Sequence, residues 1–429
     1  MKTILYPERD TWDSICQRPL MDRSGLEDSV RGILGKVKAD GDRALFDLSE
    51  KFDGVMLKEL KVSSSEIEGS AAKIPDELRE AINVAMANIE KFHLSQLINE
   101  QVIETTKGVR CWRKNVPVGR VGLYIPGGTA PLFSTVLMLA VPAKIAGCPE
   151  IILCTPPDKN GDVNPLILYT ANLTGITDIF RIGGAQAIAA MAYGTQSVPK
   201  VDKIFGPGNQ YVTKAKEMVQ LDGIAIDIPA GPSEVLVIGD KNADPSFVAS
   251  DLLSQAEHGT DSQVILLTDS PDLINAVKKE TNSQALLLPR VEIALKALEN
   301  SFFILLKSLQ DCIEFSNIYA PEHLIISVSD PHFLADQVEN AGSVFLGKYS
   351  CESAGDYASG TNHTLPTCGC AKSFSGVSTD SFIKKITFQE VSSEGLKNIG
   401  PVIEKMAEAE LLHGHGNAVT LRLKSLEND

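Results

Sequence analysis

The chain has 429 residues, 43% hydrophobic and 22% charged, a composition typical of a globular protein large enough for two or three domains. Forty basic and 55 acidic residues give a formal net charge of −15, which disfavours nucleic acid or an anionic membrane as partner and favours a small molecule. The N-terminal apolar run is too short for a signal peptide, and residues 132–143 are too few to cross a bilayer. We therefore expect a cytoplasmic protein without membrane contact.

Helical periodicity dominates the first quarter of the chain. The spacing of Leu, Ile, Val and Ala predicts helices over residues 26–38, 40–52 and 75–97, and the helical texture continues to about residue 110. Little chemistry is visible in this region, so we interpret it as scaffold.

From residue 120, short apolar runs alternate with helical patterns. The first series predicts strands over 121–124, 151–155, 179–182, 203–205 and 224–228 and helices over 131–146, 165–173, 186–193 and 209–221. The second predicts strands over 235–239, 264–268, 303–306, 324–328 and 343–346 and helices over 245–258, 271–279 and 309–318. Such alternation is typical of βαβ units on a parallel sheet.

The two series predict an α/β fold of two doubly wound, Rossmann-like parallel-sheet modules with small N- and C-terminal helical extensions. We place the N-terminal extension at 1–24, the first module at 25–123 plus 235–378, the second at 124–234 and the C-terminal extension at 379–429. Residues 349–379 are polar, rich in Gly and without periodicity, and residues 389–412 return to a helical pattern. A long irregular segment in a compact chain is more often functional than idle.

Four glycine loops follow predicted strands of the second module, at 124–129, 181–186, 205–209 and 229–233. None has the G-x-G-x-x-G spacing, and a tight turn explains any one of them. Because parallel strands deliver their loops to the same edge of a sheet, four together favour a phosphate-bearing or dinucleotide ligand.

Polar residues that could do chemistry gather near turns. Gln255 and His258, three apart at the end of a predicted helix, would share a face that could hold a metal or substrate, although a plain polar helix end before Gly259 explains them equally well. Glu322 and His323 offer a carboxylate and an imidazole for proton transfer, but the pair by itself favours a structural histidine. More distant Asp and His residues could converge on zinc, which accepts both ligand types; those considered are Asp356, His363, Glu410 and His415.

Eight scattered cysteines lack the density of a disulfide scaffold. Cys368 and Cys370 have a spacing that fits neither a zinc knuckle nor a redox motif. Cys111 and Cys154 have no neighbouring sequence that indicates an activated thiolate.

Long strings in this chain resemble the histidinol dehydrogenase family from about residue 25 to residue 423. They are VGLYIPGGTAPLFSTVLMLAVPAKIAG, GGAQAIAAMAYGT, KIFGPGNQYV, DIPAGPSEVLV, LLSQAEHG, APEHL, SAGDYASGTNHTLPT and NAVTLRL. The resemblance implies a zinc-dependent homodimer with shared active sites, one zinc per subunit, that oxidises L-histidinol to L-histidine through the aldehyde with two molecules of NAD.

The resemblance also implies roles for particular residues. The zinc ligands would be Gln255, His258, Asp356 and, from the other subunit, His415. The same four, with Ser233, His323 and Glu410, would contact the substrate. The dinucleotide would contact Tyr124, Gln186 and Asn209. Glu322 would activate water, and His323 would be the general acid and base while zinc orients the substrate's imidazole and amine. His363 is assigned only to the periphery of the site.

Two departures and two alternatives stay open. His413 is a second imidazole beside His415, and Lys372 stands where the family more often has arginine. A related NAD-dependent dehydrogenase acting on another alcohol would differ in the residues around the substrate's imidazole. A non-catalytic metal or nucleotide sensor would not need both Glu322 and His323, because binding requires no proton relay.

Overall fold

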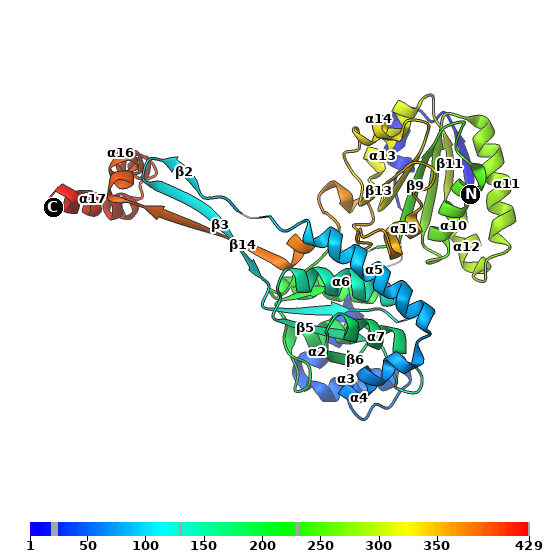
Figure 1. Ribbon diagram of the computed structural model, residues 1–429, viewed down its shortest axis with the longest axis horizontal. Coiled ribbons are helices and arrows are strands. Elements are labelled where there is room, and N and C mark those ends of the chain that lie inside the picture. The colour runs from blue at the N-terminus through cyan, green and yellow to red at the C-terminus, as the bar shows by residue number, and fades with distance from the viewer. Residues whose placement is uncertain (19–24, 99, 128–130, 229–230, 428–429) are drawn as a thin grey trace. The chain divides into compact units, whose positions relative to one another are not determined.

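The computed structural model describes residues 1–18, 25–98, 100–127, 131–228 and 231–427, and these divide into two compact units. The first unit comprises residues 1–96 and 119–381, and the second comprises 97–118 and 382–429. Figure 1 shows the elements of both. Among the described residues, no helix is long and apolar enough to cross a membrane.

The first unit contains a six-stranded, fully parallel sheet in the order β1-β11-β10-β9-β12-β13. In chain order its strands are β1 (Lys2–Leu5), β9 (Glu234–Gly239), β10 (Gln263–Thr268), β11 (Phe302–Leu305), β12 (His323–Ser327) and β13 (Ser343–Leu346). The central strands are continuous apolar runs because both of their faces are covered: Val235 and Val237 pack in one core, and Leu236 and Ile238 in another.

Helices cover both faces of this sheet. On one face lie α10 (Pro245–Ala256), α11 (Pro271–Ala285) and α12 (Val291–Glu299), and on the other α1 (Trp12–Ile15), α13 (Leu309–Tyr319) and α14 (Pro331–Ala335). The short helix α15 (Glu352–Tyr357) begins the polar segment after β13. Apart from α15 and the 3₁₀ turn Cys370–Lys372, residues 349–378 have no regular structure, as predicted.

A second parallel sheet has five strands in the order β6-β5-β4-β7-β8. Its strands are β4 (Arg120–Tyr124), β5 (Glu150–Thr155), β6 (Asp178–Arg181), β7 (Lys203–Phe205) and β8 (Ala225–Ile226). The helices that follow them are α6 (Phe133–Ile145), α7 (Pro165–Leu173), α8 (Gly184–Tyr193) and α9 (Gln210–Leu221). The predicted α/β class with two doubly wound parallel sheets is confirmed.

The predicted boundaries of the first module were wrong at its N-terminal side. Its early helices are α2 (Leu26–Asp40), α3 (Asp42–Asp53), α4 (Ser64–Gly69) and α5 (Asp76–Leu94), with the 3₁₀ turn Ser70–Lys73. The apolar stripe of α2, including Leu26, Val30 and Leu34, packs with α8 and α9 on the five-stranded sheet. Periodicity shows that a stripe is buried, but not which sheet buries it.

The proposed N-terminal extension was also wrong as a separate piece. Residues 2–5 form β1, whose Lys2 to Leu5 pair in register with Phe302 to Leu305 at the edge of the six-stranded sheet. A four-residue strand whose partner lies so far along the chain leaves no local signal in the sequence. The following 3₁₀ turn, Arg9–Thr11, leads into α1.

The second unit contains an antiparallel sheet in the order β14-β3-β2 and two helices. Its elements are β2 (Ile103–Thr106), β3 (Val109–Pro117), β14 (Ile383–Val391), α16 (Ser393–Ala409) and α17 (His413–Glu427), and the 3₁₀ turn Thr379–Phe382 precedes β14. The prediction of helix up to residue 110 was wrong, because β2 and the start of β3 lie there. The predicted C-terminal helical extension contains α16 and α17, but β14 precedes them and pairs with β3 along nine residues. β2 and β14 are largely exposed and β3 is mostly half-buried, so these strands lack the apolar run that reveals a fully buried strand.

Candidate functional site

The end of α10 positions the first two candidate ligands. Asp244 caps the start of this helix by accepting the Ser246 N–H at 2.9 Å, and Pro245 occupies its first turn. The helix ends at Ala256, so Gln255 lies in its last turn and His258 follows just after it, where the His258 N–H still donates to the Gln255 carbonyl at 3.2 Å. The predicted helix over 245–258 was thus slightly too long, but the two residues do remain one turn apart.

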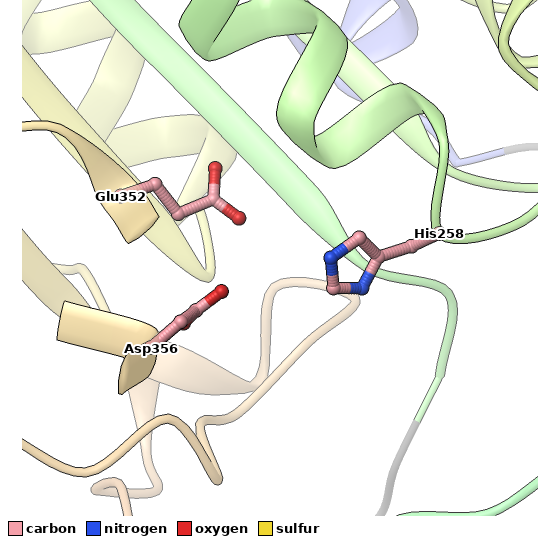
Figure 2. A group of neighbouring side chains, drawn as sticks. All are labelled: His258, Glu352 and Asp356. Atoms are coloured by element: carbon pink, nitrogen blue, oxygen red, sulfur yellow. The ribbon is translucent and has the colours of Figure 1, made fainter. Parts of the chain in front are cut away.

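Helix α15 brings two carboxylates to His258. Glu352 and Asp356 are four residues apart and therefore share a face of α15. One ligand atom from each of His258, Glu352 and Asp356 lies within 4.8 Å of the others, and Figure 2 shows the two carboxylates and the imidazole turned toward a common space. The structure thus brings together His258 and Asp356 as predicted and adds Glu352. The i, i+4 spacing of Glu352 and Asp356 was the one signal that could have identified it.

Two polar side chains of this region are buried without hydrogen-bond partners among the described residues. Gln255 is fully buried, and within the described part of the chain neither its amide oxygen nor its amide nitrogen has a hydrogen-bond partner. The same holds for both carboxylate oxygens of Glu352, which is 1% exposed. Because an unsatisfied buried carboxylate or amide is costly, these atoms fit a site that a bound ion completes.

Glu322 and His323 lie at the start of β12, beside the same cluster. The Glu234 N–H donates to Glu322 Oε2 at 2.8 Å, and the Glu234 carbonyl oxygen lies 3.1 Å from His323 Nδ1. On the other side of the ring, His323 Nε2 lies 3.6 Å from Asp356 Oδ1. An Nδ1–H hydrogen bond to this carbonyl directs Nε2 toward Asp356, and Nε2 is the nitrogen that accepts a proton when the ring is neutral.

Burial and charge shift the pKa values of this group. Burial raises the pKa of Glu322 to about 8 and that of Glu352 well above its usual range. For His323, burial lowers the pKa, but the charges of Glu352, Glu322 and Asp356 outweigh it and raise the value to about 10. His258 is exposed, but desolvation by the groups around it still lowers its pKa and so favours the neutral imidazole that binds a metal. Several carboxylates packed around one imidazole attract a cation.

The remaining residues predicted to contact substrate fall in two places. Ser233 lies in a 310 Å³ cavity that His258 and Asn209 also line. Glu410 and His415 belong to the second unit, where Glu410 is the C-cap of α16 and His415 lies in the first turn of α17, next to His413. All three of these second-unit side chains are exposed.

His363 lies beside the cluster, as the prediction of a peripheral residue implies. Its Nδ1 lies 2.9 Å from the carbonyl oxygen of Asp356, and its Nε2 lies 3.2 Å from Thr135 Oγ1. It therefore links the end of α15 to α6.

Cys154 lies in β5, where burial raises the pKa of its thiol, and Cys111 lies in the second unit. An apolar site that raises a thiol pKa does not suit a nucleophile.

Tyr124, Gln186 and Asn209 line a larger cleft of about 1180 Å³. The Tyr124 hydroxyl accepts the Gly184 N–H at 3.0 Å, and Asn209 Oδ1 caps α9 by accepting the N–H groups of Tyr211 and Val212. These residues come from β4, α8 and the start of α9, so the crevice lies where the strands of the five-stranded sheet end. The loop residues Gly128, Thr129, Pro229 and Ala230 lie outside the described residues.

Gly206 brings the β7 loop against β4 in this cleft. Its φ of +125° is open to glycine, and a Cβ there would lie 2.0 Å from the carbonyl oxygen of Tyr124. A buried ion pair holds the loop: Asp227 accepts the Gly206 N–H at 2.7 Å, and Lys216, which pairs with Asp227, donates to the Gly206 carbonyl at 2.9 Å.

We expect Lys216→Met to lower the free energy of unfolding by about 3–5 kcal/mol, because it leaves the buried Asp227 carboxylate without its cation. Urea denaturation followed by circular dichroism measures this change. Lys214→Met is the matched control on the same helix: Lys214 pairs with Glu27 and Glu217 near the surface, and its loss should cost less than about 1 kcal/mol. Equal costs for the two variants would contradict a special role for the buried pair.

Comparisons with known proteins agree with this picture. The family model described as histidinol dehydrogenase matches residues 16–423. The histidinol dehydrogenase of Bacteroides thetaiotaomicron is 59% identical over 427 residues, with all of both chains covered, and that of Escherichia coli K12 is 54% identical over 416 residues, with 96% of this chain and 95% of the relative covered. A crystal structure of histidinol dehydrogenase from Elizabethkingia anophelis superposes with a TM-score of 0.98 at 56% identity, covering 100% of this chain and 99% of that one. The chain belongs to the histidinol dehydrogenase family and is an oxidoreductase of histidine biosynthesis.

Proposed function

We propose that this enzyme carries out the zinc- and NAD-dependent, four-electron oxidation of L-histidinol to L-histidine through L-histidinal. The observation that carries the proposal is the place of a proton-transfer pair beside a metal-ligand cluster. The ring of His323 lies 3.8 Å from the Glu352 carboxylate and 3.6 Å from that of Asp356, and Glu322 lies 3.7 Å from the same ring. A dehydrogenase that oxidises an alcohol and then a hydrated aldehyde needs both a base and a water-activating carboxylate.

Gln255, His258 and Asp356 would hold the metal, with His415 of a second copy of the chain as the fourth ligand. The donor set of imidazole, carboxylate and amide suits zinc, and the unpartnered buried atoms of Gln255 support a ligand there. When bound, zinc would orient the imidazole and amine of the substrate and offset the negative charge that raises the pKa of His323. Glu352 lies near enough to compete as a ligand.

In the first oxidation, His323 Nε2 takes the proton of the substrate hydroxyl as hydride leaves the same carbon. A bound NAD would supply the hydride acceptor, its nicotinamide ring. The hydrogen bond from His323 Nδ1 to the Glu234 carbonyl keeps the ring in the tautomer and orientation that this step needs.

In the second oxidation, the aldehyde must first gain a hydroxyl group. Glu322 takes a proton from water while the water oxygen bonds to the aldehyde carbon, and burial places its pKa at about 8, close to a working pH. The protonated His323 returns its proton to the former carbonyl oxygen, which completes the hydrate. The neutral imidazole then takes a proton from the hydrate as a second hydride leaves for another NAD, and the carboxylic acid that forms ionises. One alcohol, one water and two NAD thus give one carboxylate, two NADH and three protons.

The cleft that Tyr124, Gln186 and Asn209 line is the proposed dinucleotide site. Its place at the end of a parallel sheet with glycine loops supports this assignment. Ser233 and, from the second copy, Glu410 would contact the substrate. A homodimer with shared active sites is part of the same proposal, as is a cytoplasmic location, which the lack of disulfide bonds among the cysteines of the described residues supports.

The stoichiometry of the reaction tests the proposal. With zinc present, we expect the purified protein to form two NADH for each L-histidinol consumed, because the aldehyde is oxidised before release. Absorbance at the NADH band together with chromatographic quantification of L-histidine measures both products. One NADH per alcohol with accumulating aldehyde, or no NADH, would contradict the proposed four-electron reaction, and other amino alcohols assayed in parallel test the choice of substrate.

A further inference from the structure

A buried ion pair lies behind Glu322 and His323. Arg18, from the segment after α1, donates to both carboxylate oxygens of Glu234, from Nε at 2.8 Å and from Nη2 at 2.9 Å. The side chain of Glu234 is 1% exposed and that of Arg18 is 17% exposed. A third donor, the Cys368 N–H, reaches Glu234 Oε1 at 3.1 Å. This carboxylate is therefore fixed on several sides.

The main chain of Glu234 contacts both residues of the proton-transfer pair. Its N–H donates to Glu322 Oε2 at 2.8 Å, and its carbonyl oxygen lies 3.1 Å from His323 Nδ1. Any rotation or shift of Glu234 within β9 would move both contacts together. Arg18 opposes such a shift, because it holds the carboxylate of Glu234 in place.

Arg18 also holds the chain that leads into the pair. Its Nη2 donates to the Tyr319 carbonyl at 2.7 Å, and its guanidinium carbon lies over the Tyr319 ring, 3.7 Å from the centroid. The next residue, Ala320, has a φ of +53°, a conformation that costs a residue with a Cβ and that its neighbours must therefore maintain. Arg18 thus binds the two segments, β9 and the turn before β12, between which Glu322 and His323 lie.

We propose that Arg18 is a positioning residue for the reaction: by clamping Glu234 and the Tyr319–Ala320 turn, it sets the orientation of Glu322 and His323 without touching the substrate. The proposal rests on the function proposed above. Stability alone does not account for such a pair, since a buried ion pair gains little over apolar residues of similar size. The ion pair is accounted for if it gives rigid support to the reacting groups, because a displacement of a reacting group by about 1 Å can lower the rate about 100-fold.

The test compares Arg18→Ala, Arg18→Lys and Glu234→Gln with the wild-type enzyme. We expect kcat of Arg18→Ala to fall by about 10- to 100-fold with the KM values for L-histidinol and NAD within about twofold, because orientation and not binding is lost. Guanidinium ion at millimolar concentration should restore part of kcat. The kcat of Arg18→Lys should stay below that of the wild-type enzyme, since an ammonium group cannot bridge both carboxylate oxygens of Glu234 and the Tyr319 carbonyl.

Arg9→Ala is the matched control. Arg9 also lies in the N-terminal segment, over the Trp12 ring and paired with Glu314, but it is exposed and away from Glu234. It should keep wild-type kcat. If Arg18→Ala does not fold, Glu234→Gln, which keeps the shape and main chain of residue 234, takes its place and should show the same fall in kcat with unchanged KM.

A second measurement is independent of turnover. In ¹⁵N-histidine-labelled protein, which has seven histidines, the hydrogen-bonded Nδ1–H signal of His323 is identified by its loss in His323→Gln. We expect this signal to shift or disappear in Arg18→Ala and to persist in Arg9→Ala. An active wild-type enzyme whose kcat and His323 signal both survive Arg18→Ala overturns the proposal, whereas a wild-type enzyme without activity overturns the proposed function and leaves the spectrum to decide on Arg18.

Discussion

Replacement of Glu322 by Gln is expected to slow the oxidation of L-histidinal by about 10²- to 10⁴-fold, the range that a general base contributes. Gln has nearly the same shape as Glu and still accepts the Glu234 N–H through its amide oxygen, so the fold of the site should survive. It cannot take a proton from water, and the aldehyde then remains unhydrated. The first hydride transfer requires no water, so the oxidation of L-histidinol to the aldehyde should lose much less.

His323→Ala should slow both oxidations by a similar factor, because the same imidazole takes a proton in each. Single-turnover experiments that begin from L-histidinol or from L-histidinal separate the two steps through the NADH that each produces. Glu339→Gln, at an exposed position between β12 and β13, is the control and should behave as wild type. If Glu322→Gln and His323→Ala had the same effects on both half-reactions, the two roles assigned here would be wrong.

Loss of His258 is expected to remove the metal and the activity together. His258→Ala should lower bound zinc from one per subunit to nearly none after dialysis and should reduce turnover by more than about 100-fold, the loss that even the outer partners of metal ligands can cause. Metal analysis of the dialysed protein measures the first effect. Chelation of the wild-type enzyme should abolish activity, and added zinc should restore it.

Gln255 and Glu352 give the sharper version of this experiment. Both are buried and lack hydrogen-bond partners among the described residues, but only Gln255 belongs to the proposed ligand set. We expect Gln255→Leu to lose zinc and Glu352→Gln to retain it. The exposed His332, replaced by Ala, is the control for loss of an imidazole and should keep its zinc. If Gln255→Leu retained zinc and Glu352→Gln lost it, Glu352 and not Gln255 would be the zinc ligand.

Much of the parallel sheets could be predicted from the sequence because both faces of each are covered. Residues 235–239 are an uninterrupted apolar run, and they form most of β9 with every side chain buried. The same reasoning found β10, β12 and β13 nearly to the residue. Where both faces of a strand are buried, the local run of apolar residues is enough to predict the strand.

Exposed and distant partners could not be predicted in this way. The strands β2 and β14 are exposed and β3 is largely half-buried, so no buried apolar run reveals them. In addition, β14 pairs with β3 across most of the length of the chain, and spacing does not indicate such a pairing. The lack of a local pattern also explains why one residue of the site was not predicted. Glu352 lies in a short helix inside an irregular segment, without a periodic pattern to show that its side chain turns inward.

The pairing of β1 with β11 has a consequence for the nascent protein. Lys2 pairs with Phe302, so the first strand made by the ribosome has no partner until about 300 residues have followed, some 15–60 s at the usual pace of translation. Likewise, β3 waits for β14, and a strand pair alone is barely stable in water. The six-stranded sheet and the antiparallel sheet are thus completed late in synthesis, and until then their unpaired strand edges are templates for pairing with other chains.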